Sequence, residues 1–178
     1  MKKKILLITV AFCAMATAMY AQDIKREETT YLGVGFGFDY GGFGGKIEVL
    51  PVKYLGLFAG LGYNLSSIGW NVGASAKLLP NSKVTPTLSA FYGYNAVLVI
   101  KGASEYNATS YSVTFGGGVD IKMGGNGNKL SINLFIPIRS QKFMDKYDAA
   151  LASSYVEMES ELLPIAFSIG YNFNISKR

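Results

Sequence analysis

Large apolar side chains alternate with small or polar ones along eight successive segments of this chain. A period of two residues is that of a β-strand, whose side chains point alternately to the two faces of a sheet. The alternation predicts strands over residues 32–40, 43–49, 55–64, 68–78, 88–100, 111–122, 129–139 and 165–175. Little of residues 32–175 is left for any other structure, so we expect an all-β fold.

The connections between these strands alternate in length. Residues 50–53, 79–83 and 124–128 carry the Pro, Asn and Gly that tight turns favour. The connections at the opposite end are residues 39–42, 64–67, 102–109 and a 21-residue stretch, 140–160. This arrangement predicts antiparallel neighbours joined up and down, with loops at one end and tight turns at the other.

The composition of the two strand faces indicates which one points outward. Thirteen glycines fall on the small or polar face: Gly33, Gly35, Gly37, Gly44, Gly56, Gly60, Gly62, Gly69, Gly73, Gly93, Gly116, Gly118 and Gly170. The other face is almost entirely Leu, Ile, Val, Phe, Tyr and Trp, more bulk than the inside of an eight-stranded barrel holds. Turned outward, that face suits lipid, and closure of the sheet satisfies the backbone hydrogen bonds. We therefore predict an eight-stranded antiparallel up-and-down transmembrane β-barrel.

Aromatic side chains cluster at two heights along the predicted strands. If the first strand runs toward the loops, the predicted girdles comprise Tyr40, Phe43, Tyr63, Trp70 and Tyr111 on the loop side, and Tyr171 and Phe173 on the turn side. Two aromatic girdles, one at each membrane interface, are typical of outer-membrane barrels.

The first 21 residues have the layout of a secretory signal peptide. Lys2, Lys3 and Lys4 precede an apolar run, residues 5–12, and small residues follow, with Ala21 as a candidate cleavage point. We therefore divide the chain into a signal peptide, residues 1–21, and an outer-membrane barrel domain, residues 22–178. Cleavage leaves 14 basic and 12 acidic side chains, too small an excess for a nucleic-acid-binding surface.

The residues of many catalytic and metal sites are missing. The chain has no histidine, and its one cysteine, Cys13, lies in the predicted signal peptide. The mature chain therefore lacks the usual zinc ligands, a Ser-His-Asp triad and a catalytic thiol. The last loop carries five acids that fit a solvated surface better than a catalytic cleft: Asp145, Asp148, Glu157, Glu159 and Glu161. We expect no enzyme, no cofactor and no metal site.

Several charged side chains fall on the inward face of the predicted strands. The expected polar network of the lumen comprises Asp39, Lys46, Glu48, Asp120 and Arg139. Three further inward lysines, Lys77, Lys122 and Lys129, lie near strand ends where water can solvate them. These groups either line a polar path for ions or small solutes, or pair with one another and plug a narrow lumen, because buried charges need partners.

The longest predicted strand and the longest loop indicate that the end of the barrel that carries the loops is covered. Residues 88–100 exceed the 9–11 residues that a membrane span needs, and residues 96–100 are apolar on both faces. In the last loop, Phe143, Tyr147 and Leu151 recur at helical spacing. We expect a short helix there that packs on the hairpin of residues 88–122 and forms an apolar lid over the lumen.

The sequence is compatible with two interpretations of this lid. In one, the loop is simply covered and holds no ligand. In the other, the lid borders a small hydrophobic pocket, helped by four side chains expected to point inward: Phe58, Phe91, Val97 and Val99.

The leader, the eight strands and the C-terminal segment resemble those of the small OmpA/OmpX/Ail-type outer-membrane barrels of Gram-negative bacteria. Residues 170–175, a glycine followed by spaced apolar residues, are similar to the C-terminal assembly signal of such proteins. The chain departs from that signal at Ile169, where a polar residue is usual, and at residues 176–178, which follow in place of a terminal aromatic. The resemblance implies insertion by the barrel-assembly machinery.

The predicted function is structural or interactive. We expect a monomeric outer-membrane barrel with a filled polar lumen that stabilises the envelope or presents its extracellular loops to a partner, in an adhesion-like role. One alternative is a narrow channel or pocket for small or hydrophobic molecules. A second is a soluble periplasmic lipocalin-like binding barrel with the two faces reversed.

Overall fold

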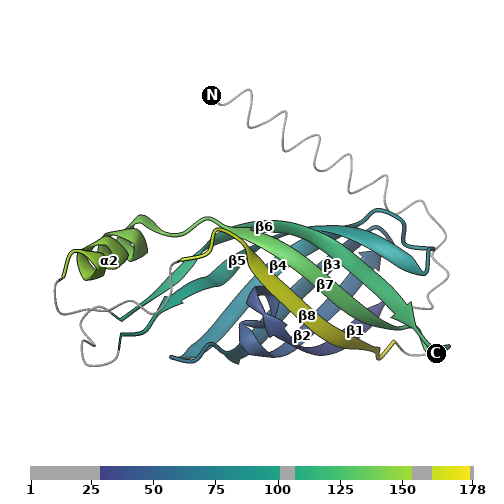
Figure 1. Ribbon diagram of the computed structural model, residues 1–178. Coiled ribbons are helices and arrows are strands. Elements are labelled where there is room, and N and C mark those ends of the chain that lie inside the picture. The colour runs from purple at the N-terminus through teal and green to yellow at the C-terminus, as the bar shows by residue number, and fades with distance from the viewer. Residues whose placement is uncertain (1–28, 101–106, 154–161, 177–178) are drawn as a thin grey trace, which may run out of the picture.

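The computed structural model describes residues 29–100, 107–153 and 162–176, and the predicted signal peptide, residues 1–21, lies outside these ranges. Eight antiparallel strands close into one barrel in which each strand pairs with the next and β1 pairs with β8 (Figure 1). The strands are β1 (Thr30–Gly37), β2 (Gly42–Val52), β3 (Leu55–Tyr63), β4 (Ile68–Lys77), β5 (Val84–Leu98), β6 (Ala108–Met123), β7 (Asn128–Pro137) and β8 (Ala166–Asn174). The predicted all-β, up-and-down barrel is confirmed.

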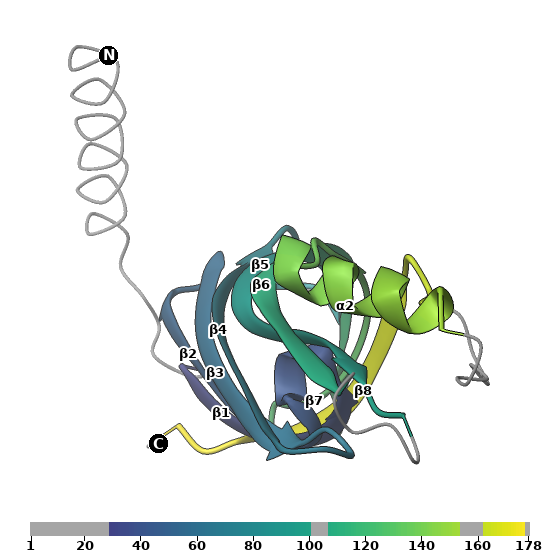
Figure 2. The same ribbon diagram turned by 90° about the vertical axis from the view of Figure 1, so that its left-hand side faces the viewer.

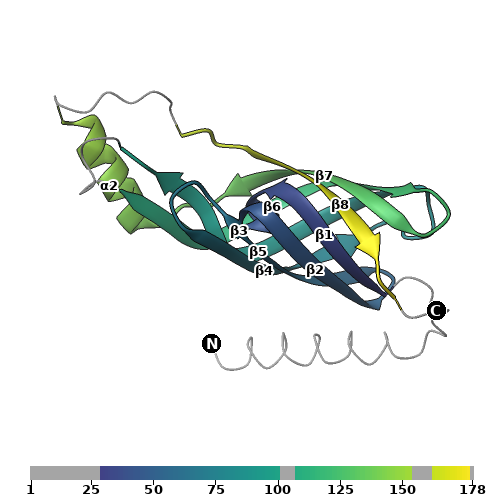
Figure 3. The same cartoon turned by 90° about the horizontal axis from the view of Figure 1, so that it is seen from below.

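Two helical segments accompany the strands in the described ranges. The 3-10 turn η1 (Phe38–Tyr40) joins β1 to β2, and helix α2 (Gln141–Leu151) follows β7, as predicted for the last loop. Neither has the length and apolar content that a helix needs to cross a membrane. β5 and β6 are the longest strands, with 15 and 16 residues, and α2 lies at their far ends, beyond the rest of the barrel (Figures 1 and 3). We call this end the loop side and the opposite end the turn side.

The outer wall of the barrel is apolar and its inside is polar. Each strand exposes large apolar side chains, for example Phe36, Ile47, Leu61, Val72, Leu88, Phe115, Leu134 and Phe167. The inward side chains of the same strands include many buried polar groups, among them Asn71, Ser75, Thr87, Thr114, Asn133 and Asn172. The predicted orientation of the two faces is therefore confirmed.

The end of the predicted first strand folds into the barrel instead of extending its wall. β1 stops at Gly37, and η1 turns inward, so that it lies in the middle of the barrel in the end-on view (the dark blue turn in Figure 2). The reversal uses Gly37, Gly41 and Gly42, whose φ angles of 135°, 73° and 112° are rare for L side chains. Tyr40 is consequently fully buried, and its predicted place in the loop-side girdle is wrong.

Glycines on the inner face of the wall make room for η1. A Cβ atom at Gly60 would overlap the backbone oxygen of Asp39, and one at Gly62 would lie 2.5 Å from the backbone oxygen of Tyr40. A Cβ atom at Gly170 would overlap the Tyr40 hydroxyl. These glycines thus form a seat for η1, whereas Gly73 and Gly116 make room for the Phe91 and Phe135 side chains, as expected of a small lumen lining.

The two ends of the described chain close the barrel. β8 pairs with β1 from Ile169 opposite Phe36 to Asn174 opposite Tyr31. Beyond this ladder, the Ser176 hydroxyl accepts hydrogen bonds from the backbone N–H groups of residues 29 and 30, at 2.7 and 3.0 Å. The sheet therefore has no free edge along β1 or β8.

We expect Gly60→Val to lower the free energy of unfolding by about 1–3 kcal/mol, the usual cost of overpacking, because the new side chain overlaps the backbone of η1. Gly125→Val is the matched control, since nothing lies within 4 Å of its Cβ position. Unfolding midpoints followed by circular dichroism compare the two variants. Equal midpoints would contradict the role of Gly60 as part of the seat.

Candidate functional site

Four charged side chains meet across the lumen in a ring. Lys77 Nζ lies 2.7 Å from Glu48 Oε1 and 2.8 Å from Asp120 Oδ2. Lys129 Nζ contacts the same two carboxylates, with 2.9 Å to Asp120 Oδ2 and a direct ion pair with Glu48. The four residues come from β2, β4, β6 and β7, and none is more than 6% exposed. We call this group the ion-pair ring.

Hydroxyl groups complete the hydrogen bonding of the ring. Ser75 Oγ donates to Glu48 Oε1 at 2.9 Å, and Ser131 Oγ donates to Asp120 Oδ1 at 2.5 Å. Ser131 in turn accepts from the Asn172 amide at 2.9 Å. Each carboxylate therefore has two lysines and one hydroxyl as partners, which offsets much of the cost of its burial.

A second ion pair anchors η1 to the wall. Lys46 Nζ lies 2.5 Å from Asp39 Oδ2, and the Ser168 hydroxyl donates to the other carboxylate oxygen. The Lys46 ammonium also lies over the Tyr40 ring, 4.3 Å from its centroid, and the Tyr40 hydroxyl donates to Asn172 Oδ1 at 3.2 Å. The charges of Asp39 on η1 and Lys46 on β2 thus neutralise each other.

Three phenyl rings fill a further part of the lumen. Phe58 and Phe91, which were predicted to point inward, contact each other at 5.9 Å between ring centroids, and Phe91 contacts Phe135 at 5.0 Å. The space left among the charged, hydroxyl and Phe58 side chains is only about 10 Å³, room for about one water molecule. A second space of about 30 Å³ borders Lys77, Asp120 and Lys129. Both spaces are small, which favours the paired-charge interpretation.

The ion-pair ring differs in membership from the predicted network. Asp39, Lys46, Glu48 and Asp120 lie inside as predicted, but Arg139 does not join them. It follows the end of β7, and its Nη2 donates to the backbone oxygen of Leu163. Its predicted role in the lumen is therefore wrong.

Two lysines predicted to be solvated at strand ends belong instead to the ring. Lys77 and Lys129 are each 5% exposed, whereas Lys122 is only partly buried. Strands in a barrel are tilted and staggered, so the ends of β4 and β7 can lie level with inward residues of other strands. Solvation at a strand end is thus replaced by ion pairing across the lumen.

The remaining aromatic residues of the predicted girdles lie on the outer wall. Phe43, Tyr63, Trp70 and Phe173 are exposed. On the loop side, the Trp70 ring lies 5.7 Å from the ring of Tyr111. On the turn side, the rings of Tyr171 and Phe173 are 4.9 Å apart. That these heights coincide with the two membrane interfaces remains a prediction.

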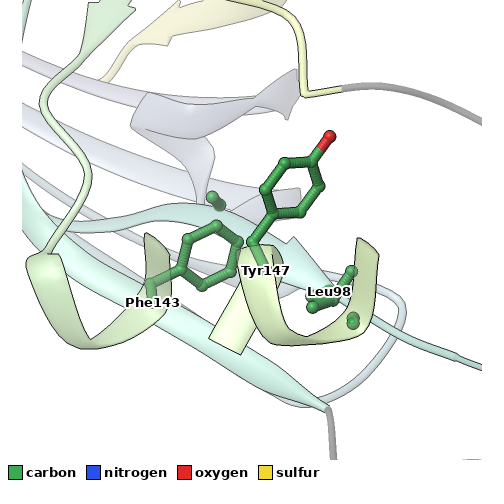
Figure 4. Close-up of a cluster of buried hydrophobic side chains, with 5 residues drawn as sticks. Leu98, Phe143 and Tyr147 are labelled. Carbon is green, nitrogen blue, oxygen red and sulfur yellow. The ribbon is translucent and has the colours of Figure 1, made fainter. Parts of the chain in front are cut away.

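Helix α2 packs on the ends of β5 and β6. Phe143 and Tyr147 project from successive turns of α2 (Figure 4) and form a buried cluster with Ala96, Leu98 and Ala150. The predicted packing of this helix on the hairpin is confirmed. We call residues 95–98, residues 108–110 and α2 together the hairpin–helix unit.

The details of this packing differ from the prediction in three respects. Leu151 is 53% exposed and does not join the cluster. The pairing of β5 with β6 shifts between Tyr94 and Ala96, so that Ala96 and Leu98 are buried, whereas Val99 is exposed and Val97 only partly buried. In Figure 2, α2 runs along the rim of the barrel end from β5 and β6 toward β8, whereas η1 lies in the middle of the barrel, where the predicted lid was expected to cover the lumen.

No protein-family model matches the chain, and no curated protein matches its sequence. The resemblance to OmpA/OmpX-type barrels is supported by the closed eight-stranded antiparallel sheet. Within the described ranges, no group of three or more acidic or cysteine side chains is placed to hold a metal ion. Glu157, Glu159 and Glu161 lie outside those ranges.

We expect Lys129→Met to lower the free energy of unfolding by about 3–5 kcal/mol, because it leaves two buried carboxylates with one cation. The double variant Lys129→Met/Glu48→Gln restores a neutral ring and should regain much of this loss. Chemical unfolding of both variants provides the comparison. A double variant less stable than the single one would count against the paired ring.

We expect the double variant Phe143→Asp/Tyr147→Asp to release α2 from the barrel, because it introduces charges into the apolar cluster. Trypsin should then cleave faster after Arg139, just before the released helix, while the barrel core stays resistant. Leu151→Asp is the matched control, since Leu151 lies outside the cluster. If trypsin cut the double variant and the wild type at the same rate, the helix would not depend on this cluster.

Proposed function

We propose that this chain is an outer-membrane β-barrel protein with a sealed lumen, and that its role is structural or interactive through the hairpin–helix unit. The observation that carries the proposal is the polarity of the barrel, whose outer wall is apolar on all eight strands while charged groups are buried inside. Lipid is the surrounding that suits such a wall.

The outer wall is unfavourable in water. Soluble monomers rarely expose contiguous apolar patches larger than a few hundred Å², and here exposed apolar side chains follow every strand around a closed sheet. A soluble lipocalin-like barrel would need the opposite arrangement, with apolar residues around an internal ligand cavity. The ion-pair ring lies in that place instead.

The groups that lie in the lumen argue against the conduction of ions through the barrel. An ion crossing the barrel would have to pass η1, the Asp39–Lys46 pair, the ion-pair ring and the phenyl rings. The two described spaces that border these groups measure about 10 and 30 Å³, so passage would require breaking buried ion pairs. We therefore favour a plugged barrel over a channel.

Export and assembly are part of the same proposal. A cleaved signal peptide would take the chain across the inner membrane of a Gram-negative cell, and the barrel-assembly machinery would insert it into the outer membrane. A closed sheet offers no edge for pairing with a second copy, which favours a monomer. We assign the chain no catalytic role, because it has no histidine and its one cysteine, Cys13, precedes the barrel.

The proposal is tested by the heat-dependent mobility of the protein in isolated outer membranes. We expect the unboiled chain to run differently from the boiled one on a denaturing gel, because a closed barrel resists detergent at room temperature. Leu134→Arg, on the outer wall, should reduce the folded fraction, since an arginine facing mid-membrane costs about 2–4 kcal/mol. Leu151→Arg, similarly exposed but on α2, should leave the folded fraction unchanged.

Two results would overturn the proposal. One is a chain that is soluble without detergent and shows no mobility shift. The other is a Leu134→Arg variant that folds as well as Leu151→Arg, because that outcome would mean that water rather than lipid surrounds the outer wall.

A further inference from the structure

The loop-side turn between β3 and β4 displays a leucine in an unfavourable backbone conformation. Leu65 has a φ of 73°, the only positive φ of a non-glycine residue in the described ranges. Its side chain is 79% exposed, more than any other large apolar side chain in those ranges. A glycine or an asparagine would fit this backbone with less strain, and a polar side chain would suit water better. A surrounding other than water would account for the leucine.

Hydrogen bonds within the protein hold this turn against the outer wall. The Tyr63 hydroxyl, which is exposed on that wall, donates to the backbone oxygen of Leu65 at 3.2 Å. The Tyr111 hydroxyl donates to the backbone oxygen of Ile68 at 3.3 Å. The buried side chain of Asn64 accepts from two backbone N–H groups of the turn, at 3.2 and 2.8 Å. These backbone groups therefore have partners without water, as a lipid surrounding requires.

The surface around the turn is apolar and uncharged. Residues 54–76, which comprise β3, the turn and most of β4, contain no charged side chain. Phe43 and Ile68 lie opposite Tyr63 on the two neighbouring strands, and both are exposed, so the turn is continuous with the apolar outer wall. Helix α2, also on the loop side, carries four charged side chains: Lys142, Asp145, Lys146 and Asp148. The two loop-side elements therefore suit different surroundings.

We propose that the β3–β4 turn binds the lipid of the outer leaflet, with Leu65 inserted among the acyl chains just below the headgroups. Trp and Tyr side chains concentrate at this depth, and the rings of Trp70 and Tyr111 lie beside the turn, 5.7 Å apart. Ser66 and Ser67, exposed on the same turn, supply hydroxyls for the headgroup region. The hairpin–helix unit, with its charged helix, stands in the water beyond.

This inference rests on the proposed outer-membrane location and adds the height of the barrel in the bilayer. On the side of β3 and β4, the wall is immersed up to its loop-side turn. On the side of β5 and β6, the strands continue past that height and carry α2 (Figure 1). An external partner therefore meets the hairpin–helix unit and not the β3–β4 turn.

The experiment places single cysteines in a Cys13→Ser background, which removes the one native thiol. Each variant of the full chain is labelled with a bimane fluorophore and reconstituted in phosphatidylcholine vesicles. Leu65→Cys tests the turn, Leu134→Cys on the outer wall is the control for lipid, and Leu151→Cys on α2 is the control for water. We expect phosphatidylcholine with a nitroxide on its acyl chain to quench the labels at residues 65 and 134, and aqueous iodide to quench only the label at residue 151.

A label at residue 65 that iodide quenches and the nitroxide lipid does not would overturn the inference, because the turn would then face water and be open to a protein partner. Equal lipid quenching at residues 65 and 151 would also overturn it, since the turn would not differ from α2. The label at residue 134 separates this inference from the proposed function. If the lipid quenches residue 134 but not residue 65, only the position of the turn is wrong, whereas quenching at neither residue refutes the membrane barrel itself.

Discussion

The ion-pair ring joins strands that are far apart in the sequence. Glu48, Lys77, Asp120 and Lys129 come from four different strands, and each carboxylate contacts both lysines. Burying one of these charges without its partners would cost several kcal/mol, so the four must be buried together. This is possible only in a narrow closed sheet that brings β2, β4, β6 and β7 around one point. Closure of the barrel and neutralisation of its interior are therefore the same event.

The apolar wall explains why so much of the interior is polar. A soluble barrel gains its stability from apolar side chains packed inside, whereas here most of the large apolar groups point outward. The interior is held instead by hydrogen bonds, ion pairs and the inward-folded η1, whose backbone fits against glycines of the wall. The loop-side end is stabilised differently, because α2 and β5 pack their apolar side chains together in a buried cluster. The molecule thus combines two kinds of core.

The period of two predicts the strands, their order and their outward face, because each of these depends on local alternation. Tyr40 shows where that reasoning ends: its spacing continues the first strand, but the positive φ angles at Gly37 and Gly41 reverse the chain. The inclusion of Lys77 and Lys129 in the ring depends on stagger between distant strands, which no local pattern encodes. The shift at Ala96 likewise depends on pairing with β6.

The pairing of β1 with β8 has a consequence for the order of events in folding. The first strand finds its second partner only among the last residues of the chain, and Ser176 completes that contact with residues 29 and 30. Contacts between residues so distant in sequence form slowly, because a long loop must close first. A partly folded chain that lacks β8 therefore exposes two unpaired strand edges, which promote aggregation. The barrel topology therefore requires that the edges of the earlier strands are protected until β8 pairs with β1.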